Sequence, residues 1–134
     1  MKYEKVVLDF ETTGLSSKYD EILQVSAIDQ DGNVLINEYC KPKSISTWEE
    51  AEAIHKISPA MVFDKKPFED YVEILTDILT NAAEIIIYNA DFEVGFLKKY
   101  GVREEVFFAA WQCTDVRTLA RKIRQGYHRQ AGWR

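Results

Sequence analysis

Cysteine is scarce in this sequence: only Cys40 and Cys113 are present, and neither belongs to a CxxC pair. The sequence therefore indicates neither a zinc site nor a disulfide framework. Long apolar runs are also missing, because EIIIY at 84–88 is far shorter than the roughly 20 residues that cross a bilayer. The N-terminus has no apolar signal segment. These absences argue against a membrane protein or a disulfide-rich secreted protein, and a cytoplasmic location is expected.

Acidic residues are absent from the end of the chain. All 22 lie at or before Asp115, and six of the 17 lysines and arginines follow it: Arg117, Arg121, Lys122, Arg124, Arg129 and Arg134. The net charge is −5 for the whole chain, and the residues up to Asp115 are more acidic than this value indicates. Their negative charge argues against binding nucleic acid through overall charge. Two interpretations of the basic end stay open, a solvated helix face with a frayed end and a segment that contacts phosphates.

The composition is that of an ordinary globular domain, with 46% hydrophobic and 29% charged residues over 134 positions. Such a chain is long enough to bury one core. Its first apolar run, VVLDFETTGL at 6–15, holds two acids, Asp9 and Glu11. Side chains alternate along a strand, so both acids share one face and repel each other. A cation between them would remove the repulsion; the alternative is an exposed strand end with solvated acids.

Apolar and alternating segments predict five strands, at 5–10, 21–30, 34–40, 84–88 and 106–112. The DGN triplet at 31–33 predicts a hairpin between the second and third of them. Segment 84–88 is apolar at nearly every position, which is typical of a strand buried on both faces.

Helical spacing accounts for much of the remaining chain. Thr47 followed by Glu50 is a capping-box pattern. The expected helices are 46–57, a turn from Pro59, 67–80, 90–101 and 114–123, the last starting from a cap at Thr114 or Asp115. This order predicts an α/β fold, with a three-stranded antiparallel meander plus parallel strands in one mixed sheet and helices flanking it. Sites in such sheets form where strands end and helices begin, so residues 9–11 and 89–93 are expected to converge.

Three segments in this order, DFETTGL, IHKISPAMVFDKKPF and YNADFEVGFL, resemble the DEDDh 3'–5' exonucleases. That family includes the proofreading subunit of bacterial DNA polymerase III, and the resemblance covers about Lys5 to Lys122. It implies a ribonuclease-H-like fold, two Mg²⁺ or Mn²⁺ ions, and removal of nucleoside monophosphates from 3' ends of single-stranded DNA or RNA. A DNA polymerase is an implied partner.

The resemblance also implies roles for single residues. Asp9, Glu11 and Glu93 take the positions of the catalytic metal ligands. The positions of substrate contacts are taken by Thr12, Thr13, Gly14, Leu15, His55, Asn89 and Phe92. Leu15 would pack against the last base. His55 would face the substrate groove, with a capping or packing role as the alternative, and it is not expected to be the general base.

The second motif departs from the family pattern at two positions. Glu93 stands where the family has aspartate, and Tyr88 stands where it has histidine. A glutamate is one methylene longer, so it can still reach a metal ion, but with looser geometry.

The third family motif, H-x-x-x-x-D, is not found in these residues. It supplies the general base and the last metal ligand, yet Trp133 stands five residues after His128. Truncation, a frameshift and a shortened chain would each explain this ending. We therefore expect an incomplete exonuclease-like domain at 1–122, a basic tail at 123–134 for which disorder is one interpretation, and impaired activity. Apolar surface left open by the missing segment would favour a homodimer.

These motifs are compatible with three functions. The first is a metal-dependent 3'–5' exonuclease. The second is a non-catalytic remnant, or a module that binds a nucleotide or a nucleic-acid end with the same fold. The third, a phosphatase-like hydrolase with Asp9 as nucleophile, is disfavoured because that motif requires D-x-D and this chain has Glu11.

Overall fold

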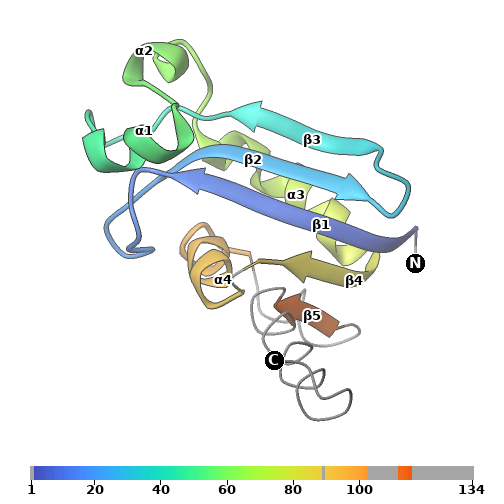
Figure 1. Ribbon diagram of the computed structural model, residues 1–134. Helices are drawn as coiled ribbons and strands as arrows, with labels where there is room; N and C mark the ends of the chain where they lie inside the picture. The colour runs from blue at the N-terminus through green and yellow to red at the C-terminus, as the bar shows by residue number, and fades with distance from the viewer. Residues whose placement is uncertain (1, 89, 103–111, 116–134) are drawn as a thin grey trace, which may run out of the picture.

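The computed structural model describes residues 2–88, 90–102 and 112–115. Their elements, in chain order, are β1 (Tyr3–Thr12), β2 (Ile22–Asp29), β3 (Val34–Tyr39), α1 (Glu49–His55), α2 (Pro59–Val62), the 3₁₀ turn η1 (Phe68–Tyr71), α3 (Val72–Thr80), β4 (Ala82–Ile87), α4 (Ala90–Lys99) and β5 (Gln112–Asp115) (Figure 1). Within these ranges no helix is both long and apolar enough to span a membrane.

The strands form one five-stranded mixed sheet in the order β3-β2-β1-β4-β5. The central strand β1 pairs antiparallel with β2 and parallel with β4, and β5 is parallel to β4. The carboxyl ends of β1, β4 and β5 therefore point to the same side of the molecule (Figure 1). This confirms the predicted sheet, an antiparallel meander followed by parallel strands.

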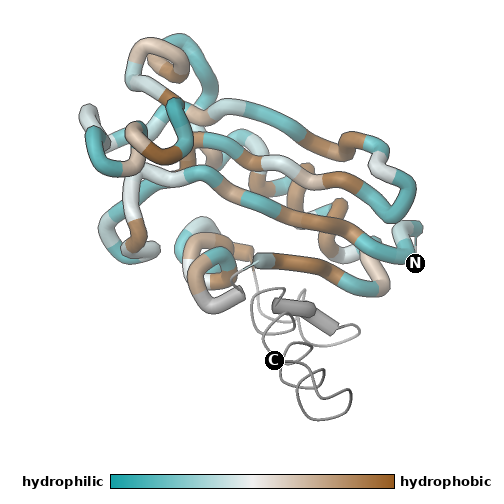
Figure 2. The backbone as a smooth tube through the Cα atoms, viewed as in Figure 1, coloured by the Kyte–Doolittle hydropathy of each residue, from teal (hydrophilic) through white to brown (hydrophobic). Residues whose placement is uncertain are grey.

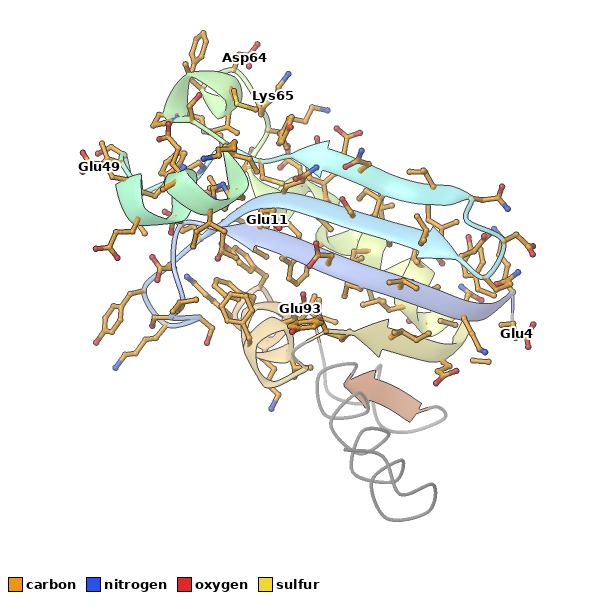
Figure 3. The ribbon with its side chains drawn as sticks, in the orientation of Figure 1. Glu4, Glu11, Glu49, Asp64, Lys65 and Glu93 are labelled. Carbon is orange, nitrogen blue, oxygen red and sulfur yellow. The ribbon has the colours of Figure 1, made fainter. Side chains whose placement is uncertain are left out.

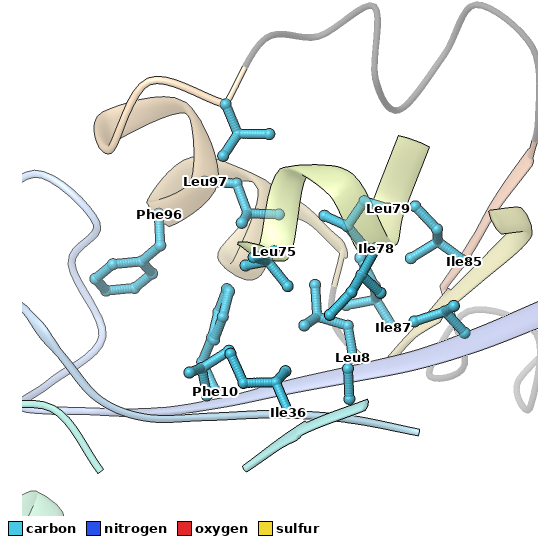
Figure 4. Close-up of a cluster of buried hydrophobic side chains, with 14 of the residues drawn as sticks. Leu8, Phe10, Ile36, Leu75, Ile78, Leu79, Ile85, Ile87, Phe96 and Leu97 are labelled. Atoms are coloured by element: carbon cyan, nitrogen blue, oxygen red, sulfur yellow. The ribbon is translucent and has the colours of Figure 1, made fainter. Parts of the chain in front are cut away.

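The core lies between one face of the sheet and the helices α3 and α4 (Figure 4). β1 contributes every second side chain to it, from Val6 to Phe10, and α3 contributes Leu75 and Leu79; each of these is at most 5% exposed. Figure 2 shows the corresponding hydrophobic stretches in the middle of β1 and along β4. The alternation of β1 therefore directs its apolar half toward α3 and its acids away from it.

The side of the sheet opposite α3 is here called the open face, and Val7, Asp9 and Glu11 of β1 point to it. Val7 is 38% exposed, and its register partners Ile28 and Ile86 are partly exposed as well. No helix of the described residues lies in front of this face in Figure 1. Ile85 and Ile87 of β4 are buried and Ile86 is only partly buried, so the described residues cover one face of this strand and leave the other open, where the sequence predicted burial on both.

The start of α1 differs from the sequence prediction. The Thr47–Glu50 capping box is not formed, since the N-cap residue is Trp48 and no side chain caps the helix. Trp48 is 5% exposed and its indole Nε1 donates to the carbonyl of Ile57 over 2.7 Å. Burial of this large ring sets where the helix begins, and it outweighs the local capping preference.

The last strand also lies elsewhere than predicted. β5 begins at Gln112, where the predicted strand 106–112 ends, and 106–111 lie outside the described residues. Thr114 and Asp115, the two cap candidates of the last predicted helix, pair in parallel with Ile86 and Ile87 of β4. The rest of that predicted helix and the 123–134 tail also fall outside the described ranges.

The β2–β3 hairpin is closed by the carboxylate of Asp29. It accepts hydrogen bonds from the backbone N–H groups of Asp31 and Asn33, and from the Asn33 side chain, at 2.9 Å each. The Asn33 amide is the largest cause that lowers the pKa of Asp29, and burial partly opposes it. Gly32 supplies the left-handed φ of 81° that this turn requires.

This hairpin predicts a feature of the acid unfolding curve. Because the folded pKa of Asp29 lies below its unfolded value of about 3.9, the carboxylate stabilises the fold above that pH, and this stability is lost as pH falls through the folded pKa. In denaturant titrations between pH 5 and 2, Asp29→Asn is expected to lose less stability on acidification than the wild type. Asp31→Asn, in the same hairpin, controls for the change of charge. Parallel curves for Asp29→Asn and the wild type would contradict the assignment.

Candidate active site

Asp9 and Glu11 lie side by side near the carboxyl end of β1, on one face as the alternation predicted. Their register partners on β2 are the neutral side chains Ser26 and Gln24. Burial raises the pKa of Glu11 above its ordinary value, the charge of Asp9 raises it further, and His55 opposes the rise. A cation beside the two carboxylates would offset the effect of the Asp9 charge on Glu11.

Two hollows meet at this end of β1. The sheet hollow has a volume of about 640 Å³ and is lined by Asp9, Tyr88 and Glu93. The turn hollow has a volume of about 630 Å³. Its walls are Glu11, the turn after β1, and α1.

Three apolar side chains line both hollows: Phe10, Leu15 and Phe92. Leu15 is 90% exposed at the tip of the turn, whereas Phe92 is half-buried and packs edge-on against Phe96, with ring centroids 5.1 Å apart. The two hollows thus share an apolar wall, and Asp9 lines the sheet hollow while Glu11 lines the turn hollow.

The three predicted metal ligands are not gathered into one cluster. Figure 3 shows Glu11 toward the α1 end of its strand and Glu93 on α4, where it is 3% exposed. Nowhere in the described part of the chain do three His, Cys, Asp or Glu side chains lie close enough together to hold a metal ion. Asp9 and Glu11 alone form a pair of carboxylates whose chemistry fits a divalent cation.

The hydroxyl groups of Thr12 and Thr13 are turned into the protein. Thr12 Oγ1 donates to the Gly14 carbonyl over 2.7 Å, and Thr13 Oγ1 donates to Asp20 Oδ1 over 2.9 Å and accepts from the Glu21 N–H. Both residues are 7% exposed. In this turn the two hydroxyl groups are engaged within the protein, whereas the Leu15 side chain is exposed.

His55 lines the turn hollow, but both of its ring nitrogens are engaged. Nδ1 accepts a hydrogen bond from the Ile57 N–H at 3.1 Å, so Nε2 carries the proton and donates it to the Thr12 carbonyl at 2.9 Å. His55 thus connects the end of α1 to the end of β1 while also lining the turn hollow.

Two residues of the turn hollow escaped the sequence analysis. Ile54 is 84% exposed and stands in α1 beside His55; an isolated apolar residue on the polar side of a short helix was the available signal. Asp20 also lines this hollow, and nothing local in the sequence marks it. Asn89 is outside the described residues.

The family model described as "Exonuclease" matches residues 6–132 of the chain. The chain belongs to this exonuclease family. Its resemblance to the DEDDh exonucleases is thereby confirmed. Among curated proteins, the chain is 30% identical over 135 residues to the DNA polymerase III subunit epsilon of Salmonella typhimurium. It is 31% identical over 118 residues to the PolC-type DNA polymerase III of Thermotoga maritima.

The matches cover most of this chain but only part of the relatives. The Salmonella match spans 91% of the chain and 55% of the epsilon subunit, and the Thermotoga match spans 86% and 8%. A structure of E. coli exonuclease I in complex with a dA16 oligonucleotide superimposes with a TM-score of 0.74 at 22% identity, covering 95% of this chain and 30% of that one. That likeness shows the ribonuclease-H-like exonuclease fold.

Proposed function

We propose that this chain is a 3'–5' exonuclease domain that removes nucleotides from the 3' ends of single-stranded nucleic acid by metal-assisted hydrolysis. The observation that carries the proposal is the Asp9–Glu11 pair at the strand end, beside a groove with an apolar wall. The oligonucleotide held by exonuclease I supports a nucleic-acid substrate. The match to an epsilon subunit supports a DNA polymerase as partner, and the cytoplasmic location expected from the sequence stays a prediction.

The groove offers suitable chemistry for the end of a single strand. Leu15 and Ile54, both largely exposed, stand in the walls of the turn hollow with Phe92 beside them. Unpaired bases bind well against apolar and aromatic side chains because every base has a π-face. Phosphates next to those bases would meet the acids, which requires a cation between the two negative groups.

A bound Mg²⁺ or Mn²⁺ would polarise the scissile phosphate and lower the pKa of an attacking water. Asp9 and Glu11 would hold the first ion. Glu93 reaches the sheet hollow together with Asp9, so we assign it to the waters of that ion or to a second ion. The apolar wall of Phe10, Leu15 and Phe92 would hold the terminal nucleotide in place and limit water around the reacting bond.

Metal binding is expected to appear as a rise in melting temperature. At about ten times its Kd, Mn²⁺ adds roughly 1.4 kcal/mol of stability, or about 5 °C for a domain of this size. Asp9→Ala should show little of this shift in differential scanning fluorimetry. The matched control is Glu4→Ala, an exposed acid at the other end of β1, which should keep the wild-type shift. Equal shifts in all three proteins would remove the assignment.

A non-catalytic binding module is the second candidate, favoured by the lack of a three-ligand cluster among the described residues. Incubation of 5'-labelled single-stranded DNA and RNA with the protein and Mn²⁺ separates the two functions. Progressive shortening from the 3' end that Glu11→Ala abolishes supports the exonuclease. Binding without shortening supports the module, and the better of the two substrates identifies the nucleic acid.

A homodimer is also part of the proposal, since Val7, Ile28 and Val34 leave 38%, 37% and 67% of their surfaces exposed. Exposed apolar side chains that lie together favour association. Light scattering at high protein concentration is expected to give the mass of a dimer, and Val34→Lys should shift it toward the monomer. A monomer mass for the wild type throughout the concentration range would contradict this.

A further inference from the structure

The turn between β1 and β2, residues 13–21, is held together by one carboxylate. Asp20 Oδ1 accepts from the Thr13 hydroxyl at 2.9 Å, and Asp20 Oδ2 accepts from the Ser16 N–H at 3.0 Å. Asp20 and Ser16 also bond through their backbones at 2.7 Å. Gly14 packs on the same carboxylate so closely that a Cβ atom there would come within 2.5 Å of Oδ2. Asp20 therefore sets the path of the chain on both sides of Leu15.

The same turn is attached to α4 at two points. Lys99 Nζ donates to the backbone carbonyl of Asp20 over 2.6 Å. One turn earlier in the helix, a Cβ atom on Gly95 would lie 2.7 Å from Ser17 Oγ and 3.1 Å from Ser17 Cβ. Helix and turn can thus approach this closely only because residue 95 has no side chain.

These contacts link the two halves of the site. The turn continues directly from β1, which carries Asp9 and Glu11, and α4 carries Phe92 and Glu93. We propose that the 13–21 turn is the brace that sets the position of α4 relative to the end of β1, with Asp20 and Gly95 as its positioning residues. The brace would keep the groove between Leu15 and Phe92 at the width that a terminal nucleotide needs. This consequence rests on the proposed function. Errors of about 1 Å in such a site reduce its function strongly.

Gly95→Ala separates positioning from simple stability. Alanine is a better helix former than glycine, so helix propensity alone predicts a higher melting temperature. The brace predicts instead that the new methyl group pushes the turn away from α4. Affinity for a 5'-labelled single-stranded oligonucleotide, measured by fluorescence anisotropy, should fall about tenfold or more. Adding Ser17→Ala removes the 2.7 Å contact and should restore much of the affinity.

Asp20→Asn is an independent test that leaves the helix untouched. The amide oxygen can still accept from Thr13, but the amide nitrogen cannot accept from the Ser16 N–H. Loss of one hydrogen bond to a charged acceptor should again weaken oligonucleotide binding about tenfold. Asp31→Asn, in the hairpin at the opposite end of β2, is the matched control and should bind like the wild type. Hydrogen exchange of residues 13–21 and 90–99 is measured in every variant.

Each outcome decides one of the two claims. Weaker binding and faster exchange in both segments, reversed by Ser17→Ala in the Gly95→Ala background, support the brace. Unchanged affinity in Gly95→Ala and Asp20→Asn, when the wild type binds, overturns it and leaves the proposed function standing. If the wild type binds no oligonucleotide, the proposed function fails. Hydrogen exchange is then the measurement that tests the brace. Faster exchange of 90–99 in Asp20→Asn then supports the brace, and unchanged exchange overturns it.

Discussion

A chain extended by a segment that carries H-x-x-x-x-D is expected to shorten single-stranded oligonucleotides about 10²–10⁴-fold faster than the 134 residues alone. Within these residues no aspartate stands five positions after a histidine. His55, which lines the groove, has both nitrogens bonded to backbone groups and so has no lone pair for an attacking water. The added histidine would supply the base that accepts the proton of that water.

The measurement compares initial rates in Mn²⁺ for the chain with and without the segment that follows the matched region in a related epsilon subunit. The matched control is the same fusion with alanine in place of the added histidine, which should stay slow. Glu93→Asp in the active fusion is expected to raise the rate further, because the shorter side chain restores the family geometry. Rapid cleavage by the 134 residues alone, abolished by Glu11→Ala, would show that another residue supplies the base.

Phe68→Ala is expected to destabilise the protein by about 3–5 kcal/mol. Phe68 is 1% exposed and packs edge-on against two rings, Phe10 at 5.7 Å and Tyr100 at 4.8 Å between centroids. The lost ring would leave a cavity where η1, β1 and the end of α4 meet. For a domain of this size, the melting temperature should fall by about 10–20 °C.

Phe63→Ala is the matched control, since Phe63 is 67% exposed and its truncation should change stability by less than about 0.5 kcal/mol. Phe10 also lines both hollows, so Phe68→Ala should weaken oligonucleotide binding even well below its melting temperature. Equal melting temperatures for the two variants would contradict this account of the core.

The alternation of side chains by itself determined much of this fold. Strand β1 has a buried and an open half because Val6, Leu8 and Phe10 alternate with Asp9 and Glu11. The DGN turn determined the β2–β3 hairpin, and the order of elements then indicated a mixed sheet of an antiparallel meander and parallel strands. Alternation also identified the D-x-E pair in the sequence, because residues two positions apart on a strand project from the same face.

Only the tertiary structure decided how the site around that pair is built. The hydroxyl of Thr13 donates a hydrogen bond to Asp20, seven residues away, and the ring of His55 donates one to the carbonyl of Thr12, 43 residues away. The start of α1 follows from burial of Trp48, and the strand at Thr114 and Asp115 follows from pairing with β4. Sequence patterns report the periodicity of near neighbours. Hydrogen bonds and close contacts between distant segments depend on where the folded chain places them, so these roles could not be determined from the sequence alone.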